Sequence, residues 1–211
     1  MSDGNPRRRG RPRTFDRERA LAVAMREFWH RGFEPVSVAE LTAAMGITPP
    51  SLYAAFGDKK TLFREVVDRY QQTYGAFFTA ALDAEVSTRE GVARALHAAA
   101  VEYTHPDRPA GCLVISAAVN CTPGSADIAT LLREHRIANS TALRARIKAD
   151  VAAGRLPTCT DSAGLAALVG AVLQGMSQQA RDGASTAELL GVADAAMLAW
   201  PAETSAAESP R

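Results

Sequence analysis

The chain of 211 residues contains few aromatic residues and few cysteines. Aromatic residues make up 6% of it, and its three cysteines are Cys112, Cys121 and Cys159. An odd number of cysteines without a framework spacing does not favour disulfide bonds, so we expect a reducing compartment. The first residues are basic, but no apolar segment of signal-peptide length follows them. We therefore expect a cytoplasmic protein.

The sequence also lacks the motifs of common enzyme classes. It has no Gly-rich phosphate loop, no H-E-x-x-H, no G-x-S-x-G and no C-x-x-C. We expect neither a catalytic site nor a cofactor. A metal- or thiol-responsive centre built from Cys112, Cys121 and either His97 or His105 remains an alternative. The default interpretation of a buried cysteine is a small apolar side chain, with no metal bound.

One long segment without charge raises the question of a membrane span. Residues 162–180 carry no Asp, Glu, Lys or Arg, and their length is close to that of a spanning helix. Several serine and glutamine residues interrupt the segment, and its apolar residues recur at helical spacing. This pattern predicts a buried amphipathic helix, and we expect no membrane partner.

The charge of the chain is unevenly distributed. The whole chain has a net charge of +1, but residues 1–70 contain 13 Lys and Arg against 9 Asp and Glu, a net charge of +4. Five arginines fall within residues 1–13, opposed by Asp3 alone. A short, flexible basic arm of this kind is typical of proteins that bind a polyanion, although a solvated tail would look the same.

Capping residues and glycines divide the first 80 residues into helices. Asp16 is expected to cap a helix that ends before Gly32. Ser37 and Glu40 form a capping box, which predicts a second helix from Val38 to Gly46. Thr48 can cap a third, from residue 49 to about 55, and a fourth is expected over about 59–81. No segment alternates with the period of a strand, so the sequence predicts an all-α fold.

The second and third predicted helices are short and joined by a turn centred on glycine. They follow a longer amphipathic helix, and this arrangement describes a helix-turn-helix unit. In such a unit the second helix enters the major groove of DNA, N-terminal end first. Helix-turn-helix connections also occur in proteins that never contact DNA, so the geometry alone does not decide the function.

Residues 37–63, SVAELTAAMGITPPSLYAAFGDKKTLF, together with the upstream FDRERALAVAMREFWHRGFEPV, resemble the DNA-binding domain of the TetR family of transcriptional regulators. The matching positions are Ser37, Leu41, Ala44, Gly46, Ile47, Thr48, Leu52, Tyr53, Phe56, Lys59 and Leu62. The resemblance implies a three-helix DNA-binding domain over 14–60, a linking helix over about 59–81, and a helical ligand-binding and dimerisation domain over 61–200. Residues 201–211 are small and polar, and we expect them to be disordered.

The resemblance also implies residue roles at the DNA. The recognition-helix positions that face base edges or flanking phosphates in the family correspond to Thr48, Pro49, Ser51 and Ala54. Tyr53 is expected to lie against a phosphate, Lys59 to reach another, and Ser37 to present its helix N-terminus to the backbone. Each position has a structural alternative. Ser37 and Thr48 also act as helix caps, and the Tyr53 ring could instead pack internally.

The predicted recognition helix carries few side-chain donors. Bidentate contacts from Arg or Gln to a base, worth about 1–3 kcal/mol of discrimination each, are unavailable to it. We therefore expect readout through the hydroxyl groups of Thr48 and Ser51 and through apolar contacts of Pro49 and Ala54 with thymine methyl groups. The arm residues Arg9, Arg11 and Arg13 would enter a narrow minor groove.

The end of the chain predicts a dimer interface. The charge-free segment is followed by a second capping box, Ser185 to Glu188, and by another apolar helix. A helix almost without charge suggests cover on more than one side, which a two-fold partner would supply. The predicted interface residues are Leu165, Leu168, Val169, Val172, Met176, Leu189, Ala193 and Met197.

Taken together, these features predict a homodimeric transcriptional regulator that binds double-stranded DNA. We expect a repressor that binds a palindromic operator and is released by a small-molecule inducer; the sequence does not identify the inducer or its binding residues. The alternatives are a helical ligand-binding or interaction protein without specific DNA recognition, and the thiol- or metal-responsive regulator named above.

Overall fold

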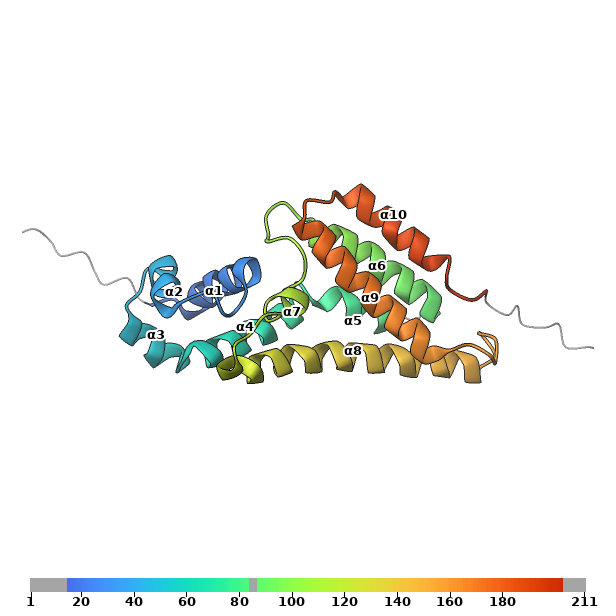
Figure 1. The fold of residues 1–211 in the computed structure, drawn as a ribbon, viewed down its shortest axis with the longest axis horizontal. Helices are drawn as coiled ribbons and strands as arrows, with labels where there is room; N and C mark the ends of the chain where they lie inside the picture. The colour runs from blue at the N-terminus through green and yellow to red at the C-terminus, as the bar shows by residue number, and fades with distance from the viewer. Residues whose placement is uncertain (1–14, 84–86, 203–211) are drawn as a thin grey trace, which may run out of the picture.

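The structure, a computed structural model, describes residues 15–83 and 87–202. Over these ranges all of its regular secondary structure is helical, as predicted, and the molecule is elongated (Figure 1). The elements in chain order are α1 (Arg17–Arg31), α2 (Val38–Met45), α3 (Pro49–Phe56), α4 (Lys59–Gln72), α5 (Ala76–Asp83), α6 (Thr88–Tyr103), α7 (Leu113–Ser116), η1 (Pro123–Ser125), α8 (Ala126–Ala152), α9 (Ser162–Arg181) and α10 (Thr186–Met197).

The predicted caps delimit the N-terminal helices. The Asp16 carboxylate accepts from the Arg19 amide, and Gly32 ends α1 at a φ of 87°. The Ser37 and Glu40 capping box begins α2, and Gly46 ends it in the left-handed conformation. Thr48 caps α3 with Pro49 at its first position. The helix-turn-helix segment is therefore built as its sequence predicts.

An aromatic cluster joins α1 to α4 beneath these helices. Phe28, Phe33 and Phe63 are buried, and the ring centroids of Phe28 and Phe63 lie 5.0 Å apart. Trp29 meets Tyr70 edge to face, with centroids 4.9 Å apart. Because aromatic pairs combine large buried area with specific ring geometry, this cluster fixes the orientation of α1 on α4.

The predicted helix over about 59–81 is wrong in one respect, because it is two helices. α4 ends at Gln72 and α5 begins at Ala76. At the break, the Thr73 hydroxyl donates to the Arg69 carbonyl at 2.8 Å, and the Gly75 amide donates to the Tyr70 carbonyl at 2.8 Å. These local bonds satisfy the carbonyl groups at the end of α4, so the helix does not need to continue.

The remaining helices form a bundle. α6, α9 and α10 lie together, and α8 runs along one side of the molecule (Figure 1). The capping box of Ser185 and Glu188 starts α10 as predicted. The buried Asp150 carboxylate of α8 accepts from the Thr88 amide at the start of α6 at 3.0 Å. Within the described residues, no helix combines the length and hydropathy that crossing a bilayer requires.

Candidate nucleic-acid interface

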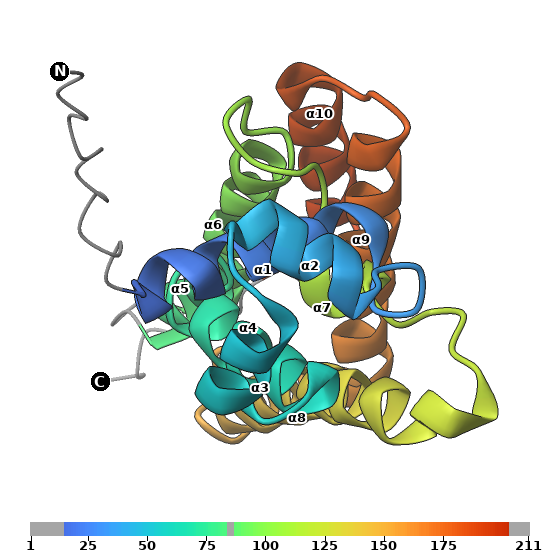
Figure 2. The ribbon, with the colours of Figure 1, turned by 90° about the vertical axis from the view of Figure 1, so that its left-hand side faces the viewer.

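The α2–α3 pair lies at one end of the molecule, in front in the end-on view (Figure 2). The turn between the two helices is closed by the Ile47 amide, which donates to the Thr42 carbonyl at 3.0 Å. Leu41 of α2, and Leu52 and Phe56 of α3, are buried. These three side chains fix the two helices on the core and leave the opposite side of α3 facing outward.

The outward side of α3 carries most of the residues predicted to contact DNA. Thr48, Pro49 and Ala54 are exposed, Ser51 is half-buried, and Tyr53 is 51% exposed. The internal packing of the Tyr53 ring, which the sequence left open, is therefore not observed. The Thr48 and Ser51 hydroxyl oxygens lie 2.9 Å apart and are hydrogen-bonded to each other. These five residues form what we call the α3 face.

Ser37 is exposed, but its polar atoms are engaged. Its amide and its hydroxyl each donate to one Glu40 carboxylate oxygen at 2.7 Å, and Arg31 donates to the other oxygen at 2.6 Å. These bonds, those from Ser37 first, lower the pKa of Glu40 to about 2. A carboxylate thus lies at the start of α2, and it partly offsets the attraction that a helix N-terminus has for phosphate.

Lys59 is turned toward the interior. Its ammonium lies 4.2 Å from the centroid of the Phe33 ring and donates to the Glu34 carbonyl at 3.4 Å. Burial lowers the pKa of Lys59, while the nearby Glu34 carboxylate opposes that shift. To reach a phosphate, the Lys59 ammonium has to leave the ring, so its predicted contact stays a prediction.

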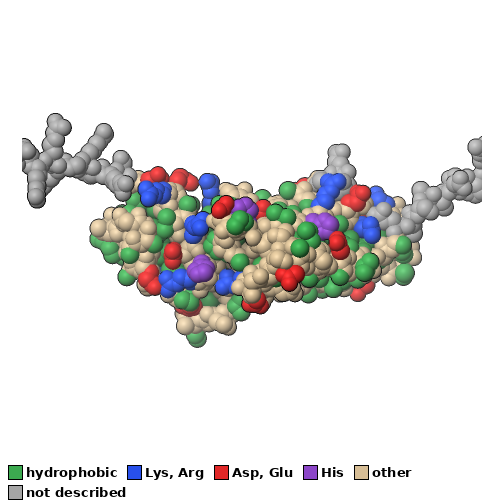
Figure 3. Space-filling model, turned by 90° about the horizontal axis from the view of Figure 1, so that it is seen from above, with side chains coloured by type: hydrophobic (Ala, Val, Ile, Leu, Met, Phe, Trp, Pro, Cys, Tyr) green, Lys and Arg blue, Asp and Glu red, His purple; other side chains and the backbone are tan. Residues whose placement is uncertain are grey.

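Other cations near α3 are held by acidic side chains. Arg17 pairs with Glu65 at 2.7 Å and lies over the Phe56 ring, while Lys60 and Arg64 both pair with Asp127. In Figure 3 the Lys and Arg side chains lie in separate groups with acidic residues among them. Sequence reasoning missed these pairs, whose members are 48 to 67 residues apart. The predicted arm residues Arg9, Arg11 and Arg13 lie outside the described residues.

The predicted dimer residues fall into two sets. Val169, Met176, Leu189 and Ala193 are buried within a single chain. Leu165, Val172 and Met197 are half-buried, and Leu168 is 38% exposed. Four of the eight residues thus pack in the core of one chain, three more pack partly against that core, and Leu168 alone of the eight is exposed.

The cysteines and histidines of the sequence-level alternative do not gather. Cys112 is buried and accepts from the Tyr70 hydroxyl at 3.4 Å, while His97 pairs with Asp194 on the bundle surface. Burial raises the pKa of the Cys112 thiol. Over the described ranges, no three His, Cys, Asp or Glu side chains are arranged to hold a metal ion.

A cavity of about 90 Å³ lies inside the bundle, and residues from each of the helices α4 to α9 line it or flank it. Aromatic and aliphatic side chains form most of its wall, including Phe77, Phe78, Leu143 and Val169. Arg136 and Gln174 add polar groups. A mostly apolar site with a few polar groups is typical of a small-molecule pocket. The sequence predicted an inducer but named none of these lining residues.

Hydrogen bonds connect the wall of this cavity to the α1 helix. Cys112, Val114 and Ile115, in or next to α7, line the cavity. At the end of α7, the Ala117 carbonyl accepts from the Phe33 amide at 2.6 Å. Just before α7, the Gly111 carbonyl accepts from the Trp29 indole at 3.1 Å. A shift of α7 would therefore displace the acceptors of these two hydrogen bonds at the end of α1.

Comparison with known proteins supplies independent evidence. Residues 20–66 match the family model for bacterial regulatory proteins of the tetR family. The HTH-type transcriptional repressor ComR of Escherichia coli (strain K12) is 38% identical over 194 residues, which cover 92% of each chain. The HTH-type transcriptional repressor BdcR of the same organism is 34% identical over 184 residues, covering 87% of this chain and 88% of BdcR.

A solved structure agrees over nearly the whole chain. A cysteine-substituted form of the TetR family transcriptional regulator CifR, complexed with 26-bp double-strand operator DNA, superposes with a TM-score of 0.85. It is 43% identical, and the match covers 90% of this chain and 100% of that one. These relatives are transcriptional regulators rather than enzymes.

Proposed function

The chain belongs to the TetR family of bacterial regulatory proteins, and on that premise we propose that it is a homodimeric transcriptional repressor that binds double-stranded operator DNA. In this proposal, α3 of each protomer enters the major groove of one half of a palindromic operator. Binding of a small molecule in the bundle cavity releases the protein from the DNA.

The observation that carries this proposal is the α3 face. Leu52 and Phe56 anchor α3, while Thr48, Pro49, Tyr53 and Ala54 point outward at the end of the molecule. This face exposes Pro49, Ala54 and the Tyr53 ring instead of packing them in the core. Its residues therefore suit contact with a groove.

Three of the described basic side chains near α3 are held in ion pairs, so phosphate binding depends more on the arm. Because Arg17, Lys60 and Arg64 are paired with carboxylates, they contribute little to phosphate neutralisation unless those pairs break. The arm supplies five arginines against one aspartate in the sequence next to α1. Arg9, Arg11 and Arg13 then provide much of the salt-dependent part of the affinity.

The dimer places two α3 faces on one DNA duplex. A single short helix reads few base pairs, and a two-fold pair reads half-sites about 34–36 Å apart. The exposed side of α9 suits such a contact, because it carries Ala167, Leu168 and Ala171 and no charge over 162–180. We call these three residues the α9 face.

The proposal is tested by in vitro selection of duplexes from a random pool with the full chain. Fluorescence anisotropy then compares the selected duplex with a scrambled one at two salt concentrations. We expect a palindromic duplex bound at least about a thousandfold more tightly than the scramble. Equal, steeply salt-dependent affinity for both duplexes would favour the helical interaction protein that lacks specific recognition.

A second measurement tests the arm alone. Deleting residues 1–13 removes five arginines, so we expect weaker binding to the selected duplex and a shallower dependence on salt. Unchanged affinity after this deletion would show that the arm takes no part.

A further inference from the structure

The wall of the cavity contains one basic side chain, that of Arg136. Arg136 on α8 is the only Lys, Arg, His, Asp or Glu among the described residues that line the cavity. The other polar groups there are neutral at physiological pH and include Gln71, Asn139, Ser140 and Gln174. The described wall of the cavity therefore carries positive charge without an acidic residue to balance it.

Among the described residues, the Arg136 guanidinium has a backbone partner but no carboxylate partner. Its Nη1 donates to the Val114 carbonyl of α7 at 2.7 Å. Within the described part of the chain, no ion pair links the guanidinium to a carboxylate. Burial lowers the pKa of Arg136. Burying a charged group is costly unless the charge is paired, and the Arg136 side chain is half-buried. An anion in the cavity would supply the missing partner.

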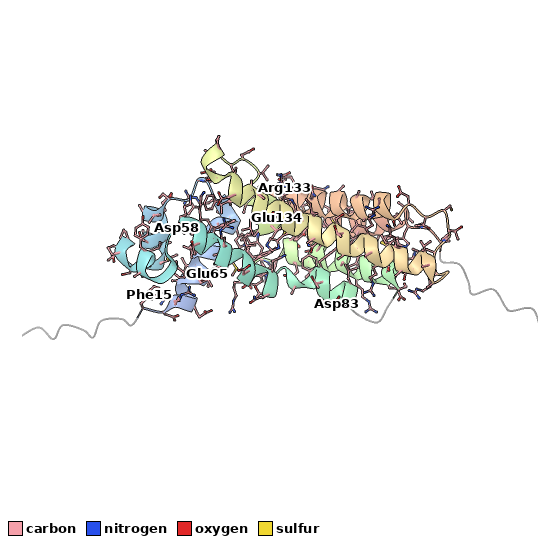
Figure 4. The ribbon with its side chains drawn as sticks, turned by 90° about the horizontal axis from the view of Figure 1, so that it is seen from below. Phe15, Asp58, Glu65, Asp83, Arg133 and Glu134 are labelled. Atoms are coloured by element: carbon pink, nitrogen blue, oxygen red, sulfur yellow. The ribbon has the colours of Figure 1, made fainter. Side chains whose placement is uncertain are left out.

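The surroundings of Arg136 also offer a route for an anion. An open groove of about 640 Å³, lined by α8 and by the segment after α7, shares Ile115, Arg136 and Gln174 with the cavity wall. Arg133, labelled on α8 in Figure 4, lines the groove as well. No described acidic residue lines the groove, so its two arginines attract negative charge toward the cavity.

From this arrangement we infer that the effector is a small organic acid whose carboxylate pairs with Arg136. Its apolar part lies against Phe77, Phe78 and Leu143. A cavity of about 150 Å³ holds one benzene, so the cavity of about 90 Å³ here suits a short-chain acid rather than one with a ring. The inference rests on the proposed function, because it names the ligand class of the same regulatory cavity.

Binding of the acid would also be communicated to α7. The guanidinium that receives the carboxylate is the one that holds the Val114 carbonyl, and α7 ends at the Ala117 carbonyl bonded to Phe33. Competition of the carboxylate for Arg136 alters the position of α7. The change reaches the end of α1 through the hydrogen bonds from Phe33 and Trp29. The acid then binds one conformation of α7 more tightly than the other and shifts the equilibrium between them.

The test uses matched pairs of acid and amide with the same apolar part: butanoate with butanamide, and hexanoate with hexanamide. Isothermal titration calorimetry and thermal melting of the full chain measure binding. We expect at least one acid to bind at least about tenfold more tightly than its amide, because the amide lacks the charge that strengthens the contact with a guanidinium. Inorganic phosphate, an anion without an apolar part, should not stabilise the protein.

The variants locate the contact. Arg136→Gln should remove the preference for the acid, and Arg136→Lys should retain part of it. Arg144→Gln is the control, because it makes the same charge change on an exposed part of α8 that lines neither the cavity nor the groove. Equal binding of acid and amide to the natural protein, or an unchanged preference in Arg136→Gln, would overturn the inference.

Anisotropy with the selected operator separates this inference from the proposed function. Release of the operator by the acid supports both. Specific DNA binding without preference for acids leaves the repressor proposal standing and overturns the ligand class. Acid binding with no specific DNA recognition supports the ligand class and overturns the repressor proposal.

Discussion

At the scale of single residues, Glu34 joins the α1–α2 connection to the segment before η1. Its carboxylate accepts from the Thr122 amide at 2.8 Å and from the Thr122 hydroxyl at 2.7 Å. These bonds, with a further one from Ser125, lower the pKa of Glu34 to about 2 from a usual 4.5. The ionised form is thus favoured by folding, so its stabilising effect is present above pH 4.5 and is lost as the pH falls through about 2.

The consequence can be measured as a pH-dependent difference in melting temperature. We expect Glu34→Gln to melt below the natural protein near neutral pH, with a gap that narrows between about pH 4.5 and pH 2. In a Thr122→Val background the gap should be smaller, since one donor is gone. A gap of the same size at pH 7 and at about pH 3 would contradict this account.

Tyr53 presents the simplest test of a phosphate contact. Its side chain is largely exposed, so Tyr53→Phe should leave the melting temperature unchanged. A hydrogen bond to a charged group is worth about 1.5–3 kcal/mol, and we therefore expect at least roughly tenfold weaker DNA binding in anisotropy. The loss should be similar for the operator and the scramble, because a phosphate carries no sequence information. A loss confined to the operator would instead assign Tyr53 to base recognition.

At the scale of elements, local signals predicted the helix ends well. Asp16, Ser37, Thr48 and Ser185 each cap the helix that their spacing predicts, because a cap involves residues only two or three positions away. The break after Gln72 was missed. It depends on how the Thr73 hydroxyl and the Gly75 amide bond to the preceding turn. Gly75 is a local sign of a helix end, but no proline accompanies it.

The candidate site could be predicted from the sequence only in part. The outward side of α3 follows from helical spacing, since Leu52 and Phe56 must be buried together. The role of Arg136 could not be predicted, because it depends on α7, 22 residues earlier in the chain. Likewise, the apolar pattern of α9 does not distinguish Val169, which packs inside one chain, from Leu168, which is exposed.

The connection between α6 and α7 should tolerate very little change. Gly111 has a φ of 77°, and a Cβ there would lie 2.6 Å from the Ser177 carbonyl oxygen. Gly183 has a φ of 99°, and its Cβ would meet no atom within 4 Å. We expect Gly183→Ala to cost about 1 kcal/mol of unfolding free energy through its φ alone. Gly111→Ala should cost clearly more, because backbone must also move. Urea unfolding of both variants measures the difference, and equal costs would contradict the contact argument.

At the scale of the whole molecule, α3 and the α9–α10 pair are well separated along an elongated shape (Figure 1). A dimer formed through the α9 face would therefore leave each α3 face free for DNA. Ala171→Glu places a carboxylate on the α9 face without touching the core, since Ala171 is exposed. Burying that charge without a partner would cost about 3–5 kcal/mol per site, so we expect monomers by light scattering and much weaker operator binding.

The matched control for this variant is Ala145→Glu, at an exposed position of α8. It makes the same substitution in a helix outside the predicted interface and should leave the dimer intact. A dimer that persists in Ala171→Glu but not in Ala145→Glu would move the interface from α9 to α8.

The bond between Phe33 and Ala117 has one more consequence. The Phe33 amide follows the end of α1, yet its acceptor belongs to the segment that closes the cavity. Protection of this one amide against exchange with deuterium thus depends on the short helix α7 staying in place, and α7 spans only four residues. The exchange rate of the Phe33 amide therefore reports how often that segment opens. Any compound that loosens α7 would shorten the lifetime of this amide proton, whether or not DNA is present.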